Sequence, residues 1–83
     1  MNSPINTFST ELQLKLRAYD RWHQVFDDGA LRSDCPDTYH EELLRQADEM
    51  DRLGLVTWQE WRELRIEADR AYLLAAAGGD YHD

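Results

Sequence analysis

The chain has 83 residues, one cysteine and a formal net charge of −8. This length supports one small domain, and a lone cysteine, Cys35, excludes an intrachain disulfide framework. The acidity argues against direct binding of nucleic acid, which needs a basic face. The first twenty residues lack an uninterrupted apolar core, and the longest apolar run, residues 71–77, is too short to span a membrane. We therefore expect a cytoplasmic protein that does not enter a membrane.

The first 28 residues predict one helix after an extended lead-in. Pro4 and several small polar residues indicate an extended segment over residues 1–8. Ser9 or Thr10 suits the N-cap, and Gly29 marks the expected end. Apolar residues at steps of three and four form the predicted buried stripe of this helix: Phe8, Leu12, Leu16, Tyr19, Trp22 and Phe26.

A second helix is predicted after a loop over residues 29–35. Pro36 fits its first turn, because the missing N–H of proline would be unpaired there in any case. Gly54 fits the left-handed position that ends a helix. The predicted buried stripe comprises Tyr39, Leu43, Ala47, Met50 and Leu53.

Residues 50–64 carry the strongest local signal in the chain, which is that of a helical hairpin. Thr57 and Glu60 have the spacing of a capping box, in which each side chain satisfies a backbone N–H of the first turn. Val56 and Trp61 hold the positions of a hydrophobic staple around it. A third helix is therefore expected to begin immediately after the turn.

The third helix is predicted from Trp58 to about Ala77, with Gly78 and Gly79 ending it and residues 79–83 forming a frayed tail. Its last two turns, residues 71–77, are apolar on all sides. Such an end needs cover from other helices or from a second chain, so Leu73 and Leu74 are candidate self-association residues. The predicted buried stripe comprises Trp58, Trp61, Leu64, Ala68, Tyr72 and Ala75.

Three helices with short links predict an all-α fold, a small antiparallel three-helix bundle built on the C-terminal hairpin, as a single domain over residues 1–83. In this arrangement the start of the third helix lies beside the start of the first and the end of the second. Trp58 and Trp61 are then expected to meet Phe8, Leu12, Met50 and Leu53.

The acidity is concentrated in the second helix. Residues 34–51 carry a net charge of −6, against 0 for residues 1–33 and −2 for residues 52–83. Over roughly 25 Å this is about one net charge per 4 Å, close to the 3.4 Å spacing of a single DNA strand. The face either binds a basic surface of another protein or is a solvated surface. Its candidate partner-binding residues are Asp34, Asp37, Glu41, Glu42, Asp48, Glu49 and Asp51.

No catalytic or metal-binding motif is apparent. His23 with Asp27, and His40 with Asp37 and Glu41, make only partial metal sites, because no HExxH or second Glu-x-x-His completes them. Cys35 lacks the companion groups of a nucleophile. We therefore expect no enzyme, no cofactor and no metal, with ordinary surface histidines.

The aromatic residues at helical spacing, which could stack on bases, are better explained as core residues because the net charge opposes nucleic-acid binding. The other alternative is a partner-binding patch, since aromatic residues are enriched at interface centres.

Two short segments resemble known families. Residues 53–61, Leu-Gly-Leu-x-Thr-x-x-Glu-Trp, are similar to the helical hairpin of short C-terminal oligomerisation modules of the SHOCT type. The Trp-x-x-Trp-Arg run at residues 58–62 resembles the end of phage tail-assembly chaperones, although the following leucine comes one place early. In size and acidity the chain is also similar to phage or plasmid inhibitors of host defence, including anti-CRISPR proteins, without a shared motif.

The sequence therefore favours a non-enzymatic, acidic protein-binding module, an inhibitor that occupies the basic nucleic-acid-binding surface of a partner protein. The alternative is a small structural or assembly protein, a homodimer or a phage assembly chaperone, which binds through apolar contacts. Salt sensitivity of binding separates the two, because charge contacts weaken with ionic strength.

Overall fold

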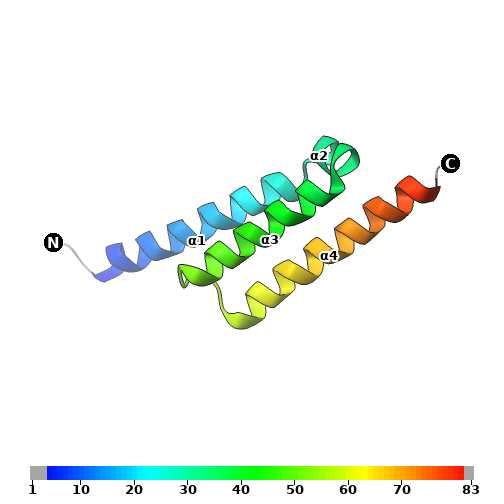
Figure 1. Cartoon of the computed structure of the whole chain (residues 1–83). Helices are drawn as coiled ribbons and strands as arrows, with labels where there is room; N and C mark the ends of the chain where they lie inside the picture. The colour runs from blue at the N-terminus through cyan, green and yellow to red at the C-terminus, as the bar shows by residue number, and fades with distance from the viewer. Residues whose placement is uncertain (1–3, 82–83) are drawn as a thin grey trace.

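The chain is all-helical in the computed structural model, which describes the backbone of residues 4–81 and the side chains of residues 10–77. No strand occurs within residues 4–81, so the predicted all-α class is confirmed. The four helices are α1 (Pro4–Phe26), α2 (Gly29–Asp34), α3 (Pro36–Arg52) and α4 (Trp58–Tyr81) (Figure 1). No helix in the described part of the chain is both long enough and apolar enough to cross a membrane.

Helix α3 runs antiparallel to α1 and to α4 and packs against both of them (Figure 1). At 1.5 Å per residue, the 17 residues of α3 span about 25 Å, whereas the 23 of α1 and the 24 of α4 span about 35 Å. The molecule is correspondingly elongated, with extents of 63 × 22 × 13 Å. The shortest of the three long helices thus lies in contact with both others and cannot cover their full lengths.

The turn between α3 and α4 is closed by Gly54, the one residue of positive φ (72°) among those described. The Leu55 N–H donates to the Met50 carbonyl at 2.9 Å, and the Gly54 N–H donates to the Asp51 carbonyl at 3.0 Å. These two bonds are the Schellman pattern, in which the residue after the helix is left-handed. The predicted role of Gly54 is confirmed.

The start of α4 is fixed by the predicted capping box. The Glu60 N–H donates to Thr57 Oγ1 at 3.1 Å, and the Thr57 N–H donates to Glu60 Oε1 at 2.9 Å. Val56 and Trp61 are half-buried against the core. The Schellman turn and the capping box together reverse the chain within five residues, 53–57. Helix α4 therefore lies beside α3.

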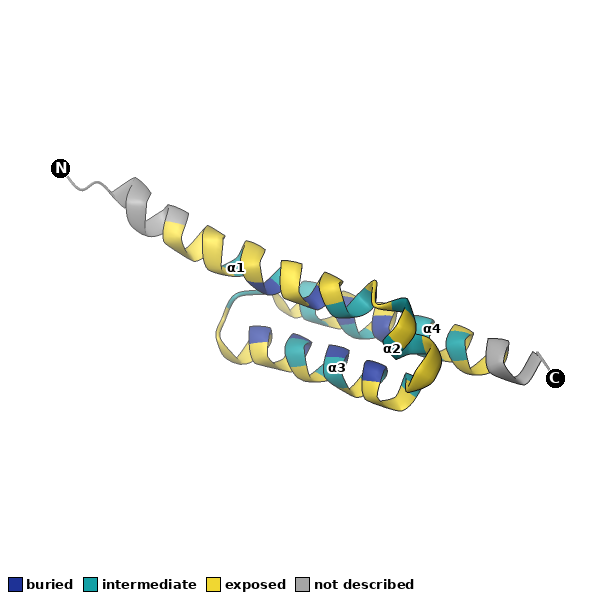
Figure 2. Cartoon of the chain, turned by 90° about the horizontal axis from the view of Figure 1, so that it is seen from above, coloured by how far each residue is buried: buried dark blue, intermediate teal, exposed yellow. Residues whose placement is uncertain are grey.

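One core joins the three long helices (Figure 2). Trp22 is 2% exposed, and its indole N–H donates to the Leu43 carbonyl at 3.1 Å. The buried Tyr39 hydroxyl donates to the Phe26 carbonyl at 2.7 Å. Both aromatic polar ends are therefore satisfied, which removes the cost of burying them. The buried residues are Ala18, Trp22, Tyr39, Leu43, Ala47, Met50, Leu64 and Ala68.

The segment predicted as a loop over residues 29–35 contains a helix instead. The Asp28 carboxylate caps α2 by accepting from the Leu31 N–H at 3.0 Å. The Cys35 N–H donates to the Leu31 carbonyl at 2.8 Å, which closes the helix before Pro36 begins α3. The loop prediction is wrong because six residues are too few to show an apolar period, which leaves the N-cap residue Asp28 as the local signal for this helix.

Both ends of the helical region extend further than predicted. Helix α1 begins at Pro4, so the extended lead-in is wrong for residues 4–8; proline is well suited to the first turn of a helix. Helix α4 continues through Gly78 and Gly79 to Tyr81, since glycine costs a helix about 1 kcal/mol but does not forbid it. Residues 1–3 and 82–83 lie outside the described residues.

Four residues predicted for the core are exposed. Leu12 and Leu16 are each 56% exposed, Leu53 is 55% exposed and Trp58 is 65% exposed. The stripe of α1 that meets α3 centres on Ala18 and Trp22, which turns Leu12 and Leu16 outward. The prediction that Trp58, Leu12 and Leu53 meet in the core is therefore wrong as to their burial, although Leu12 and Leu53 line one open hollow. The side chain of Phe8 lies outside the described residues.

Candidate functional site

Asp48, predicted to point outward from α3 as part of a partner-binding face, instead faces α4. Its Oδ1 accepts from the Trp61 indole N–H at 2.9 Å and from Arg65 at 3.1 Å. The Arg65 guanidinium also lies 5.1 Å from the centroid of the Trp61 ring, within cation–π range. Asp48 is thus part of the contact between α3 and α4.

Asp37 makes a second contact across the same helix pair. Its carboxylate accepts from the Tyr72 hydroxyl at 2.8 Å, and this hydrogen bond raises the pKa of Tyr72. Beside it, His40 Nε2 lies 2.7 Å from Asp69, and the rings of His40 and Tyr72 are 4.8 Å apart. Two of the seven predicted partner-binding carboxylates therefore serve to join helices within the chain.

Glu42 and Glu49 lie on the other flank of α3 and are paired within that helix. Glu42 accepts from Arg45 Nε at 3.1 Å, and Glu49 accepts from Arg52 Nε at 3.1 Å. The hydrogen bond from the arginine is the main cause that lowers the pKa of each carboxyl. Their negative charge is largely offset locally, because each arginine sits one turn further along.

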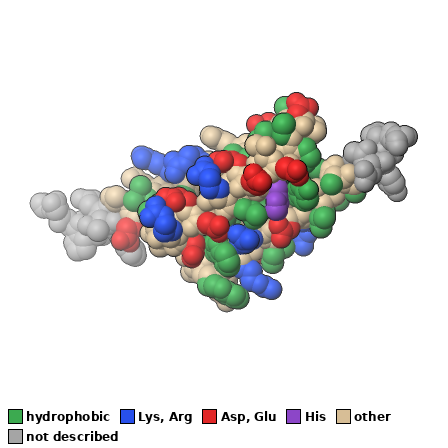
Figure 3. All heavy atoms as spheres, in the orientation of Figure 1, with side chains coloured by type: hydrophobic (Ala, Val, Ile, Leu, Met, Phe, Trp, Pro, Cys, Tyr) green, Lys and Arg blue, Asp and Glu red, His purple; other side chains and the backbone are tan. Residues whose placement is uncertain are grey.

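Asp34, Glu41 and Asp51 are exposed, and their side-chain carboxylates have no hydrogen-bond or ion-pair partner among residues 10–77. We call these three the outer carboxylates. Together with Asp37, they leave only four carboxylates without an ion-pair partner between residues 34 and 51, and Asp34 lies on α2 rather than on α3. On the face seen in Figure 3, acidic side chains alternate with Lys and Arg rather than forming an unbroken acidic surface. The similarity in charge density to a DNA strand is therefore weaker than the sequence suggested.

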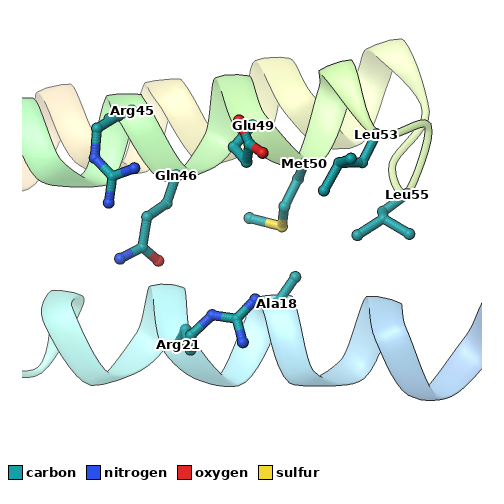
Figure 4. A pocket seen from close by; sticks show the side chains of 8 residues that line it. All are labelled: Ala18, Arg21, Arg45, Gln46, Glu49, Met50, Leu53 and Leu55. Atoms are coloured by element: carbon teal, nitrogen blue, oxygen red, sulfur yellow. The ribbon is translucent and has the colours of Figure 1, made fainter.

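A hollow of about 250 Å³ lies between α1 and α3 (Figure 4). Arg21 and Ala18 approach it from α1, while Gln46, Glu49 and Met50 approach it from α3. The carboxylate of Glu49 is paired with Arg52. Arg21, which also lines the hollow, has no carboxylate partner among the described residues. No pattern in the sequence predicts this hollow, since it depends on how α1 crosses α3.

The partial metal sites considered from the sequence are not assembled. Among the described residues, no group of three or more His, Cys, Asp or Glu is placed to hold a metal ion. His23 Nδ1 lies 2.9 Å from the Tyr19 carbonyl, and His40 contacts Asp69 of α4 rather than Glu41. Cys35 is an exposed free thiol at the junction of α2 and α3.

The candidate self-association residues of α4 are both exposed, Leu73 by 64% and Leu74 by 69%. They lie in the part of α4 that runs beyond the short α3. The apolar end predicted from residues 71–77 is therefore uncovered at these two positions within the single chain.

Comparisons of this chain with protein-family models, with curated proteins and with solved structures found no match.

Proposed function

We propose that this protein is a non-enzymatic module that binds a basic surface of another protein, where it competes with nucleic acid as an inhibitor. The observation that carries this proposal is the set of outer carboxylates, Asp34 at the end of α2 and Glu41 and Asp51 on α3, which form no ion pair among the described residues. Charges of this kind steer association with a basic partner and give salt-dependent binding.

The scaffold for this face is proposed to be an antiparallel three-helix bundle built on the α3–α4 hairpin. Support comes from the shared core of α1, α3 and α4 and from the contacts of Asp37 and Asp48 with α4. These contacts join α3 to α4, and Glu41 and Asp51 keep a fixed spacing because both lie on the helix α3. A fixed array loses less conformational freedom on binding than a flexible acidic tail would.

The test compares tagged wild-type protein with a variant in which Asp34→Asn, Glu41→Gln and Asp51→Asn remove the outer charges. The matched control carries Glu11→Gln, Asp20→Asn and Asp27→Asn, which removes the same charge from exposed acids of α1 and its C-terminal turn. A basic partner captured from the native host at low salt should be retained by the control and lost by the first variant. Added DNA or RNA should displace the wild-type protein.

Equal capture of the same partner by all three proteins, with unchanged salt dependence, would rule out the outer carboxylates as the binding surface. Loss of capture in both variants would show that net charge alone governs the interaction.

The second candidate function is a structural or assembly protein that forms a homodimer. It is favoured by the exposure of Leu73 and Leu74 on the part of α4 that α3 does not cover. Burial of such side chains by a second copy would contribute roughly 1.5–3 kcal/mol for each leucine that becomes fully buried.

A further inference from the structure

Two adjoining hollows form an open trough along the side of α1 and α3. One hollow, of about 250 Å³, lies beside Arg21, and the other, of about 500 Å³, lies beside Glu11 and Leu14. Leu53 and Leu55, at the turn between α3 and α4, line both hollows, so the two are continuous. No described residue of α4 lines either of them. We call this surface the α1 trough.

Exposed leucines give the α1 trough apolar surface that a partner can reach. Leu14 is 47% exposed and Leu53 is 55% exposed. Leu12, which lines the larger hollow, is 56% exposed. These three side chains lie outside the core cluster, so a partner can bury them without disturbing the fold.

Opposite charges without an ion-pair partner stand at the two ends of the α1 trough. Glu11 lines the larger hollow and Arg21 the smaller one, and neither side chain has a hydrogen-bond or ion-pair partner among residues 10–77. They are ten residues apart on α1, or about 15 Å, which is too far for them to pair with each other. The other charged residues of the lining, Lys15, Arg45 and Glu49, each have an ion-pair partner.

The part of the lining that α1 supplies includes a stripe that is complementary to itself. Glu11, Leu14, Ala18 and Arg21 follow one another at steps of three, four and three residues, the spacing of one helix face. Two such stripes laid antiparallel, with residue 16 at the centre, place Glu11 of each copy opposite Arg21 of the other. Leu14 of each copy then meets the hollow beside Ala18 of the other, the hollow seen between α1 and α3 in Figure 4.

We infer that the α1 trough docks a second copy of this chain through an antiparallel contact of α1 with α1 that has two-fold symmetry. Such a contact brings the same patch of both copies together, so the patch must be complementary to itself. Glu11 and Arg21 meet this requirement, and each of them gains a partner in the dimer. The inference goes beyond the proposed function, because the outer carboxylates take no part in the contact. It also differs from the homodimer alternative, which uses Leu73 and Leu74 of α4.

Helix α1 is also the long helix along which two acidic copies repel each other least. Residues 4–26 hold three bases and two acids, a net charge of +1. Residues 36–52 hold two bases and six acids, a net charge of −4, and residues 58–81 hold three bases and five acids, a net charge of −2. Like charges brought together oppose association. A contact along α1 therefore avoids much of the repulsion that a charge of −8 on each chain causes.

Sedimentation equilibrium at low salt tests the charge match. Glu11→Arg places two pairs of like charges in the contact and should weaken the dimer about ten-fold or more, and Arg21→Glu should do the same. The two substitutions together restore both pairs with their charges exchanged, so the double variant should dimerise within about three-fold of the wild type. Asp20→Arg is the matched control, because it changes the charge of α1 equally but Asp20 lines neither hollow. It should change the affinity by less than about two-fold.

Cysteine cross-linking tests the antiparallel register. Glu11→Cys and Arg21→Cys are each made together with Cys35→Ser, and their mixture is oxidised with diamide. The mixture should give a disulfide-linked heterodimer on non-reducing electrophoresis, because positions 11 and 21 of different copies lie opposite one another. Each variant alone should cross-link poorly, since the two copies of one position lie about 15 Å apart along the helices, whereas a disulfide joins Cα atoms within about 7 Å.

Several outcomes would overturn the inference. They are a wild type that stays monomeric up to ~1 mM, an equal loss in the matched control, a double variant no better than the single ones, and self-cross-linking as efficient as that of the mixture. Dissociation by Leu73→Glu with Leu74→Glu would place the contact on α4 and also overturn it. Asp34→Asn, Glu41→Gln and Asp51→Asn should leave the dimer intact, so failure of this contact and failure of the proposed function give different results.

Discussion

Asp48 on α3 and Trp61 on α4 are joined by a hydrogen bond of 2.9 Å from the indole N–H to the carboxylate. Arg65 donates to the same oxygen atom at 3.1 Å and covers the Trp61 ring. A carboxylate in the middle of an acidic helix therefore acts as the acceptor that orients the first turns of α4. This role separates Asp48 from Glu41 of the same helix, whose carboxylate has no ion-pair partner within the described residues.

Asp48→Ala should lower the stability by about 1 kcal/mol, because the indole and Arg65 both lose their acceptor. In a domain of this size that loss corresponds to a fall of several degrees in the melting temperature. Asp48→Asn keeps an oxygen acceptor for Trp61 and should cost less. Glu41→Ala is the control and should leave the midpoint nearly unchanged, so equal effects of the two alanine variants would contradict the assigned role of Asp48.

Two glycine substitutions should have opposite signs. Gly54→Ala places a side chain at φ 72° and should destabilise the protein by about 1 kcal/mol, although a Cβ would meet nothing within 4 Å. Gly29→Ala lies in the first turn of α2, where a Cβ would meet only Arg32 at an ordinary 3.8 Å. It should stabilise the protein by up to about 1 kcal/mol through helix propensity. Chemical denaturation measures both, and a stabilising Gly54→Ala would refute the left-handed turn.

The contribution of Glu60 should disappear in acid. The hydrogen bond from the Thr57 backbone N–H, followed by that from Lys15, lowers the pKa of Glu60 in the folded protein. A lowered folded pKa gives stability that is complete above the unfolded value of about 4.3 and is lost as the pH falls through the folded value.

Melting temperatures of wild type and Glu60→Gln between pH 7 and pH 3 measure this effect. Glutamine retains the capping geometry, so the difference reports the charge. The wild type should melt higher at pH 7, and the gap should close below about pH 4. Glu63→Gln, which removes one negative charge from the same helix without touching the capping box, is the matched control for the loss of charge. A gap that stays constant for Glu60→Gln would contradict the assignment.

If the homodimer alternative holds, Leu73→Glu with Leu74→Glu should convert a dimer into a monomer in light scattering, because two carboxylates would enter an apolar contact. Leu12→Glu is the control, since Leu12 is also more than half exposed but lies on α1. A monomeric wild type at high concentration would exclude this alternative. Dissociation by Leu12→Glu instead would move the contact to α1.

The local sequence determined the turn and the helices that flank it. Gly54 with the Schellman bonds, and Thr57 with Glu60, depend on backbone geometry over four to six residues, so their pattern was sufficient to predict them. The buried stripe of α3 was predicted at four of its five positions, since a helix packed on two sides has one unambiguous apolar face. Leu53 was the exception: it lies at the C-cap, where it lines an open hollow with Leu12 and Leu14 of α1 and stays 55% exposed.

Only the tertiary structure decided which face of α1 is buried and what each carboxylate contacts. Helix α1 is apolar over a wide arc, so the choice of Ala18 and Trp22 over Leu12 and Leu16 depends on where α3 crosses it. The partners of Asp37 and Asp48 lie 35 and 13 residues away along the chain, on α4. Sequence spacing reports which residues share a face of one helix, but the residues opposite that face are set by the register between helices. Helix α3 is shorter than α1 and α4, so it cannot cover either of them along its whole length. Leu12 of α1 and Leu73 and Leu74 of α4 therefore remain exposed.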